Sequence, residues 1–493
     1  MSEEKNNSVL RANYTSKTVN INEEGKYNVV SKDHKISVLP KHGERLGVML
    51  VGWGGNNGTT LTTLLDLHRR KATWESKHGT QSAEKLLGSI SQCGSVHIGY
   101  DKYGLPHSEL FKNMLDLYDP RNIVIGGWDI SNDNLYKATR KAGVIEPSIL
   151  TAETVEYLSN LTPLPSIYDP SFIATNQKTR VKNIISTSSK QEQISRIVSD
   201  IVKFRSVNSL DRVVVLWTAS TERFHNGTWA NYAELLQAIK MNDTEVSPSV
   251  LFAVASARAK CIFLNGSPQN TICPAVIDCA KVNHTFVGGE DFKTGQTKLK
   301  SALADWLVSS GIKPLSIVSY NHLGNNDGCN LKEKAQFRSK EITKKNVIDD
   351  VVDENPYLFN GRTPDHAVVI KYVPAVGDSK RAMDEYYSEL ALGGRHNLVI
   401  HNTCEDSLLA APLMLDIILF AEFFARVRIQ TGEEKQSFKP ILSMLSFFFK
   451  APVVNDNEPL INAFFRQRYG LENFTRVING LPTMDFLHLP YRI

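Results

Sequence analysis

The stretch that most constrains the fold of this chain is LGVMLVGWGGNNGTTLTTLLDLHRR, residues 46–70. Its first part is a short apolar run that predicts a strand, and the leucines after the turn recur along one face of a predicted helix. Four glycines lie in the turn between them, at Gly52, Gly54, Gly55 and Gly58. A G-x-G-x-x-G fingerprint would have its third glycine at Asn57, so this turn is a variant with one additional residue. A tight glycine turn before a helix N-terminus predicts a pyrophosphate site in a Rossmann-like, dinucleotide-binding domain.

An acidic residue that binds the cofactor ribose usually follows such a turn by about 20 residues. Glu75 is near that position, but it lies in a polar stretch. Asp129, at the end of the apolar run IVIGGWDI, is the better candidate, and it implies a polar insertion over Lys77–Gly104. A carboxylate at this position favours NAD over NADP, because it would repel the additional phosphate.

Alternating strand and helix patterns extend this domain along the chain. Strands are predicted at Asn122–Ile125, Arg212–Trp217 and Val250–Val254, and helical patterns such as QEQISRIVSDIVKF separate them. The alternation is typical of an α/β fold, with a parallel sheet and helices on both faces.

The pattern changes after about Lys298. Strands are predicted at Ala367–Val373 and Asn397–Thr403, with a helix, DSKRAMDEYYSELALGG, between them. This mixture predicts a second, α+β unit. The apolar run SLLAAPLMLDIILFAEFFA is interrupted by Asp416 and Glu422, which indicates a buried helix and not a membrane span.

Composition excludes several classes of protein. The chain has 493 residues, 56 basic against 52 acidic, which is too even a balance for a nucleic-acid-binding protein. Its six cysteines are scattered without a C-x-x-C pair, so we expect reduced thiols and no metal site. The polar N-terminus lacks the apolar core of a secretory signal, and a cytoplasmic location is therefore expected.

Two polar stretches are candidates for the site. SYNHLGNNDG, residues 319–328, follows the predicted strand PLSIVSY; such amides usually form a turn, but a polar loop at a strand end is also where sites lie. In KEKAQFRSKEITKK, residues 332–345, Lys340 and Lys344 are four residues apart on a predicted helix. They form either a solvated basic face or a site for phosphate. Lys380 follows in GDSK, and lysines grouped in a pocket depress one another's pKa.

Eight stretches together resemble one family. They are LVGWGGNNG, LWTASTERF, NGSPQNT, SYNHLGNNDG, FRSKEITK, VGDSKRAMDEYYSEL, HNTCEDSLLA and FFFKAP, from residue 46 to the C-terminus. The chain resembles the eukaryotic myo-inositol-1-phosphate synthases. The resemblance implies conversion of D-glucose 6-phosphate to 1D-myo-inositol 3-phosphate, which is 1L-myo-inositol 1-phosphate, with NAD regenerated in each turnover. It implies oxidation at C5, enolisation at C6, aldol closure and re-reduction, with no net NADH.

The resemblance also implies site residues. The implied catalytic residues are Lys340, Lys344, Lys380, Lys450, Asp291 and Asp406. The implied substrate-binding residues are Thr294, Gln296, Asn321, Leu323, Asn325 and Asp327, with Gln296 helping to bind the phosphate. The implied cofactor-binding residues are Gly52, Gly54, Gly55, Asn56, Asn57, Gly58, Asp129, Ser166, Thr218, Ala219, Asp327 and Asp406. We assign Lys340 and Lys380 to the C5 proton and oxygen, and Lys344 and Lys450 to C1 and the phosphate.

The chain departs from the family pattern at Ser220, usually Asn, and at Ala275, usually Gly, which affects expected cofactor affinity more than activity. The implied organisation is an N-terminal arm (1–45), a Rossmann-like NAD-binding domain (46–297), an α+β catalytic and tetramerisation domain (298–412), and a C-terminal segment (413–493) that returns to the NAD-binding domain. The implied assembly is a homotetramer.

Two other functions remain open from the sequence. An ordinary NAD-dependent sugar dehydrogenase would release NADH, and an NAD-binding regulator would keep the fold without turnover. A nucleic-acid-binding protein is supported only by the basic run near Lys340.

Overall fold

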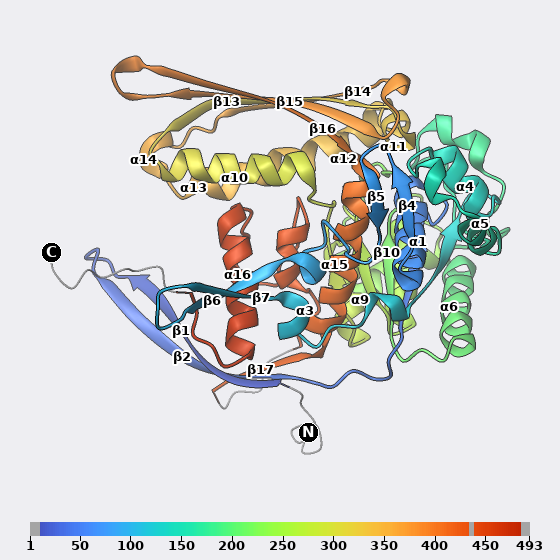
Figure 1. The fold of residues 1–493 in the computed structure, drawn as a ribbon, viewed down its shortest axis with the longest axis horizontal. Helices are drawn as coiled ribbons and strands as arrows, with labels where there is room; N and C mark the ends of the chain where they lie inside the picture. The colour runs from blue at the N-terminus through green and yellow to red at the C-terminus, as the bar shows by residue number, and fades with distance from the viewer. Residues whose placement is uncertain (1–9, 433–437, 485–493) are drawn as a thin grey trace.

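Three sheets organise the chain in the computed structural model, which describes residues 10–432 and 438–484 without the side chains of 344–346. A six-stranded sheet lies at the centre, a four-stranded sheet lies above it, and a long hairpin extends from the opposite side (Figure 1). Two small hairpins complete the strands of the described residues: β4 (Thr73–Ser76) with β5 (Gly79–Ser82), and β6 (Ser95–Tyr100) with β7 (Pro106–Leu110). These hairpins lie in the region of the predicted insertion.

The six-stranded sheet is the predicted parallel sheet. Its order is β12-β11-β10-β3-β8-β9, and all five pairs are parallel. The strands are β3 (Leu46–Val51), β8 (Ile123–Asp129), β9 (Leu164–Pro165), β10 (Val213–Trp217), β11 (Ile262–Asn265) and β12 (Val287–Gly288). β3 and β10 are buried throughout, because helices cover both faces. The α/β fold class is thereby confirmed.

Helices on the two faces form two separate hydrophobic cores. The first core includes side chains of α1 (Asn56–Arg70), α15 (Asp406–Arg426) and α16 (Phe464–Ile478). The second includes side chains of α6 (Lys190–Val207), α7 (Tyr232–Lys240), α8 (Pro248–Arg258) and α9 (Pro274–Val282). Shorter helices are α2 (Ile90–Cys93), α3 (Phe111–Met114), α4 (Leu135–Ala142), α5 (Ala152–Ser159), α11 (Asn326–Asn330), α13 (Asp349–Asp353) and α14 (Pro356–Phe359).

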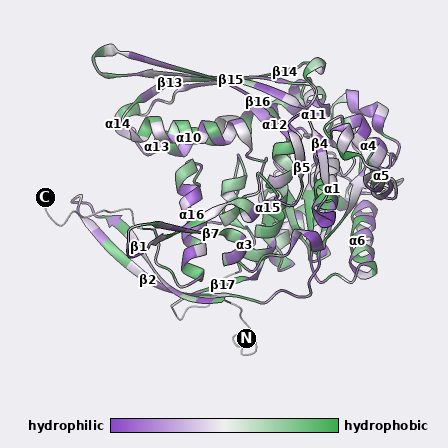
Figure 2. Cartoon of the chain, in the orientation of Figure 1, coloured by the Kyte–Doolittle hydropathy of each residue, from purple (hydrophilic) through white to green (hydrophobic). Residues whose placement is uncertain are grey.

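The apolar run with two acids is the core helix α15, which is largely hydrophobic in Figure 2. Among the described residues it is the one helix long and apolar enough to cross a membrane, but most of it is buried inside the protein. Its two acids have partners: the Asp416 carboxylate accepts hydrogen bonds from Ser89 Oγ at 2.6 Å and Ser91 N at 2.9 Å. Glu422 pairs with Arg426 at 3.0 Å. The prediction of a buried helix is therefore correct.

The four-stranded sheet has the order β14-β13-β15-β16. Its strands are β14 (Asp365–Tyr372), β13 (Lys313–Leu323), β15 (Ser379–Glu389) and β16 (Arg395–Glu405). Helix α10 (Gly295–Ser309) runs beneath one face, and α12 (Lys334–Lys345) lies between this sheet and the six-stranded one (Figure 1). The opposite face of the sheet is open in the single chain.

Two predicted elements are wrong. The predicted helix DSKRAMDEYYSELALGG contains β15 instead, and burial alternates along it: Ala382, Asp384 and Tyr386 are buried, while the residues between them face outward. The predicted strand Val250–Val254 lies inside α8, whose N-cap Ser247 accepts from the N–H of Val250. α8 is buried on all sides, so its sequence has no helical periodicity to distinguish it from a core strand.

The N-terminal arm is a hairpin. β1 (Leu10–Ile21) pairs antiparallel with β2 (Tyr27–Val38), and β2 also pairs with β17 (Val427–Thr431), which follows α15. The base of this hairpin is thus held by a strand from the far end of the chain, and its tip extends away from the body (Figure 1).

Candidate active site

A pocket lies at the carboxyl ends of the parallel strands, beneath the four-stranded sheet. This edge of a parallel α/β sheet is where ligands bind in such folds. Eighteen predicted site residues line the pocket: Gly52, Gly55, Asn56, Asn57, Asp129, Ser166, Thr218, Ala219, Asp291, Thr294, Asn321, Leu323, Asn325, Asp327, Lys340, Lys380, Asp406 and Lys450. The tertiary structure therefore brings together residues from almost the whole length of the chain.

Four predicted residues have other positions. Gly54 and Gly58 belong to the glycine turn but are not part of the lining. Gln296 is buried in the first turn of α10, behind the lining residue Thr294. Lys344 is on α12, and its side chain lies outside the described residues.

The glycine turn needs glycine for two different reasons. Gly52 has a φ of +88°, and a Cβ there would lie 2.6 Å from Ala219 Cα on the neighbouring loop. A Cβ on Gly58 would lie 2.4 Å from Trp53 O, so the turn could not fold back onto its own helix. Gly52 is therefore required both by its backbone conformation and by a close contact, whereas Gly58 is required only because the backbone approaches it closely.

The same turn fits a dinucleotide. Helix α1 begins after Gly55, which offers no side-chain cap, and its first turn contains no acidic residue. Its N-terminal N–H groups are therefore free of an internal competitor for an anion. The Asp129 carboxylate accepts a hydrogen bond from Gly54 N at 2.9 Å, which holds the acid beside the turn. Thr218 and Ala219, after β10, form the wall opposite the turn.

Gly52→Ala is expected to destabilise the fold by about 1–3 kcal/mol and to weaken NAD binding. The added methyl group meets backbone at 2.6 Å, so the turn must move. Chemical unfolding and NAD titration would measure the two effects. Gly104→Ala is the control, because Gly104 has a similar φ of +78° with open space around it. Equal losses in both variants would show that the conformation matters and the contact with Ala219 does not.

Asp291 joins two catalytic candidates. Its carboxylate is 2.8 Å from Lys340 Nζ and 3.3 Å from Lys450 Nζ, and it accepts a third bond from Thr343 Oγ1 at 3.0 Å. Asp291 is buried and has a φ of +62°, a backbone conformation that non-glycine residues seldom adopt. A strained, buried carboxylate between two amines indicates a site held for function.

The environment separates the pKa values of the two lysines. Burial disfavours both ammonium groups, but Asp291, Asp327 and Asp406 outweigh it at Lys340 and raise the pKa of that amine. At Lys450 burial dominates, the cations of Lys340 and Lys380 add to it, and the pKa falls to about 7. Lys340 is therefore a protonated acid at neutral pH, while Lys450 can exist as a neutral amine.

The third lysine has its own acid. Lys380 Nζ is 3.3 Å from Asp406 Oδ1. Burial raises the pKa of Asp406, but Lys380, Lys450 and Lys340 outweigh burial and lower it overall. The three ion pairs thus form one cluster of three amines and two carboxylates around the pocket.

Asp378 connects this cluster to the cofactor turn, and the sequence analysis missed it. Its carboxylate accepts from Asn325 Nδ2 at 2.9 Å, Asn56 Nδ2 at 3.2 Å, and Ser407 N at 2.8 Å. Asp378 stands two residues before Lys380 in GDSK, which is the one signal that could have indicated it.

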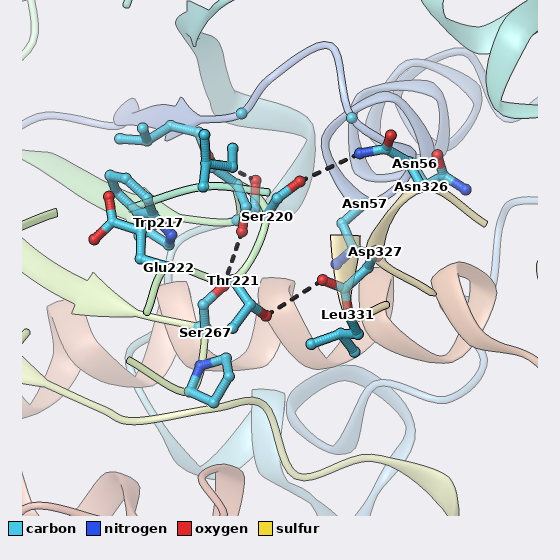
Figure 3. A pocket seen from close by; sticks show the side chains of 18 of the residues that line it. Asn56, Asn57, Trp217, Ser220, Thr221, Glu222, Ser267, Asn326, Asp327 and Leu331 are labelled. Carbon is cyan, nitrogen blue, oxygen red and sulfur yellow. Dashed lines mark hydrogen bonds between the residues drawn. The ribbon is translucent and has the colours of Figure 1, made fainter. Parts of the chain in front are cut away.

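The polar loop after β13 makes both a cap and a bridge. Asn325 caps α11 by accepting from Gly328 N at 3.0 Å. Asn326 Nδ2 donates to Ser220 Oγ at 3.2 Å, and Asp327 accepts from Thr221 Oγ1 at 3.3 Å (Figure 3). The loop therefore joins the substrate side of the pocket to the loop after β10, and the departure at Ser220 supplies one of the contacts.

Glu222 is a second residue that the sequence analysis missed. It lines the pocket near Trp217 and Ser267 (Figure 3), and burial raises its pKa to about 7. Its carboxylate accepts from Ser249 Oγ at 2.6 Å and Ser249 N at 3.2 Å, at the start of α8. Its role in the structure is therefore to fix α8 against the pocket.

Comparison with known proteins gives one consistent result. The model of the family described as myo-inositol-1-phosphate synthase matches residues 46–476. Inositol-3-phosphate synthase 1 of Rattus norvegicus is 51% identical over 91% of this chain and 81% of its own length. Inositol-3-phosphate synthase 1 of Populus euphratica is 47% identical over 97% of this chain and 95% of its own. The crystal structure of inositol-3-phosphate synthase from Caenorhabditis elegans superposes with a TM-score of 0.93 at 44% identity, covering 98% and 96% of the two chains.

Proposed function

The chain belongs to the myo-inositol-1-phosphate synthase family, and from that premise we infer that it converts D-glucose 6-phosphate to 1D-myo-inositol 3-phosphate with NAD as cofactor. The observation that carries this conclusion is one pocket that holds both the glycine turn and the cluster of Lys340, Lys380 and Lys450. A dehydrogenase needs the glycine turn and one acid or base, whereas a cyclisation needs several acid and base groups.

NAD bound at the glycine turn would supply a hydride acceptor for oxidation at C5 and a hydride donor for the final reduction, so that no net NADH would be formed. The other steps move protons or build negative charge on oxygen, which is chemistry for amines and ammonium groups. We propose that Lys340 and Lys380 act at the C5 oxygen and its proton, and that Lys344 and Lys450 act at C1 and the phosphate. The separated pKa values support a protonated Lys340 that stabilises developing oxyanions.

The test is incubation of the purified protein with D-glucose 6-phosphate and catalytic NAD. Phosphorus NMR identifies the product while absorbance reports NADH. An inositol phosphate without accumulating NADH is the expected result. NADH that accumulates with an oxidised sugar would identify a dehydrogenase, and bound NAD without any conversion would identify a regulator.

The pH dependence tests the proposed state of Lys450. Its pKa lies at about 7, below the ordinary value, so the neutral amine forms as the pH rises through that value. We expect kcat/KM to rise across the same interval, since it reports groups of the free enzyme. Lys450→Met should remove this limb of the profile. A profile that is flat around neutral pH in the unaltered protein would contradict a role for neutral Lys450.

We propose a homotetramer in the cytoplasm, assembled through the open face of the four-stranded sheet. This face exposes large side chains on three neighbouring strands: Tyr320, Met383, Tyr387 and Val399. Contiguous exposed apolar side chains favour a protein interface. All six cysteines are unpaired, which agrees with a reducing compartment. We also keep the four-part division at residues 45, 297 and 412 as a proposal.

Met383→Asp with Val399→Asp should lower the sedimentation coefficient, because two charges are placed on the proposed interface. Val207→Asp is the control: Val207 is also apolar and is more exposed than Met383 or Val399, but it ends α6, outside this sheet. Unchanged sedimentation of the double variant would contradict the interface.

A further inference from the structure

A buried polar layer lies between α10 and the four-stranded sheet, and neither the cofactor turn nor the lysine cluster uses it. Gln296 Nε2 donates to Asp384 Oδ1 at 2.7 Å. One turn further along α10, Lys300 Nζ lies 2.9 Å from His366 Nε2 on β14. Gln296, Asp384 and Lys300 are each less than 5% exposed. Burying charged groups is costly, so this layer needs a reason.

The charges in this layer balance. Burial lowers the pKa of Lys300 to about 8, with the Asp384 carboxylate acting against the change, so the amine stays protonated at neutral pH. A protonated amine can only donate, so the His366 Nε2 that it meets accepts. The Lys300 ammonium group therefore lies in the same buried layer as the Asp384 side chain, which attracts it through space.

Asp384 also fixes the direction of the Gln296 amide. The Asp384 Oδ1 oxygen accepts this hydrogen bond, so the amide turns its NH2 group toward Asp384. The Gln296 Oε1 then points the other way, where it is buried without a hydrogen-bond partner. Asn321 Oδ1 and Ser319 Oγ, on the strand paired with β15, are buried and unpartnered as well. Asn321 itself lines the pocket.

Gln296 belongs to the turn of α10 that meets the pocket. Thr294 is the N-cap of α10 and lines the pocket, and its side chain makes no capping bond. The first turn of α10 carries no acid. Movement of Gln296 would therefore move the backbone N–H groups that this 15-residue helix presents to an anion.

We propose that Asp384 is a positioning residue: through its hydrogen bond with Gln296 it fixes that amide and the first turn of α10 for the phosphate group of the substrate. The proposal rests on the proposed function, because it assumes that the phosphate of D-glucose 6-phosphate binds at this turn. Asp384 does not touch the substrate; it acts through Gln296. Lys300 keeps the carboxylate from repelling the substrate phosphate.

The test is the steady-state kinetics of Asp384→Asn. The asparagine amide can donate as well as accept, so it no longer fixes which end of the Gln296 amide faces it. The substitution also removes the negative charge that attracts Lys300. Because the hydrogen bond that orients Gln296 is lost, we expect KM for D-glucose 6-phosphate to rise about tenfold or more. kcat should change much less, since the lysine cluster is untouched. Asp384→Asn combined with Lys300→Gln should give the same rise without an uncompensated buried charge, in case the single variant does not fold.

Two comparisons separate positioning from general damage. In a Gln296→Ala background, Asp384→Asn should cause no further increase in KM, because both substitutions remove the same hydrogen bond between Gln296 and Asp384. Tyr386→Phe is the matched control on the same strand: its hydroxyl is buried and unpartnered, so KM should be unaffected. An unchanged KM in Asp384→Asn and in its combination with Lys300→Gln, or additive effects with Gln296→Ala, would overturn the inference. The proposed function would stand in that case, whereas it fails first if the unaltered protein forms no inositol phosphate.

Discussion

Lys340→Ala is expected to lower kcat by about 10²–10⁴-fold while the protein stays folded and binds NAD. Lys340 lines the pocket, and Asp291, Asp327 and Asp406 keep it protonated. Alanine removes the proton donor and leaves Asp291 with Lys450 at 3.3 Å, whose pKa should rise because the Lys340 cation no longer lowers it. Asp291 therefore keeps one ion-pair partner, so the fold should remain stable. The loss of rate should appear in the chemical steps of the reaction.

Single-turnover experiments with phosphorus NMR would measure the rate, and NAD released on denaturation would measure cofactor content. Lys334→Ala is the control, because Lys334 is exposed on the same helix. Lys380→Ala should behave like Lys340→Ala, since Lys380 is the amine that pairs with Asp406. Wild-type turnover in the Lys340 variant would refute the assignment of this residue, and loss of bound NAD would mean that it serves the cofactor.

Asp291→Asn is expected to damage both stability and activity. The carboxylate is buried between two amines, and an amide cannot compensate either of them. Removing one partner of a buried ion pair typically costs about 3–5 kcal/mol. The pKa of Lys340 should fall as well, because Asp291 is the largest of the charges that raise it. Urea unfolding would measure the stability, and the pH profile would report the shifted amine.

The pH dependence of this stability difference has a defined sign. Burial acts to raise the pKa of Asp291, but Lys340 and Lys450 outweigh it, and the pKa is lowered overall. A lowered pKa gives stability that is present above the unfolded value of about 3.9 and is lost as the pH falls through the folded value. The variant should therefore differ most from the unaltered protein near neutral pH. Asp353→Asn, at an exposed position on α13, should show little difference at any pH.

Local patterns predicted the glycine turn and the acid beside it. The glycine turn at residues 52–58 depends on conformations that glycine adopts and on the local approach of Gly58 to Trp53, so its sequence indicates it directly, although the close approach of Gly52 to Ala219 is a tertiary contact. Asp129 could be chosen because it ends a buried strand, and it lies beside that turn. The core helix α15 could be predicted because its two acids are tolerable in a buried helix with partners and not in a membrane.

Local patterns failed where burial decided the structure. β15 contains DEYYSE, a polar sequence that is compatible with a helix, but its alternate residues Asp384 and Ser388 are buried against α10. When the inner face of a strand carries polar residues, the sequence no longer shows the alternation of apolar and polar residues that would indicate a strand. α8 failed for the opposite reason, since a helix buried on all sides has no polar face.

The sequence by itself determined the Rossmann-like turn, the alternation of strands and helices around it and, through long shared motifs, the family and the residue types of the site. The tertiary structure alone decided which of them meet: Asp291 with Lys340 and Lys450, Lys380 with Asp406, and Asp378 with the cofactor turn. It also decided the different pKa values of Lys340 and Lys450, because a pKa depends on burial and on charges that are close in space and distant in the chain.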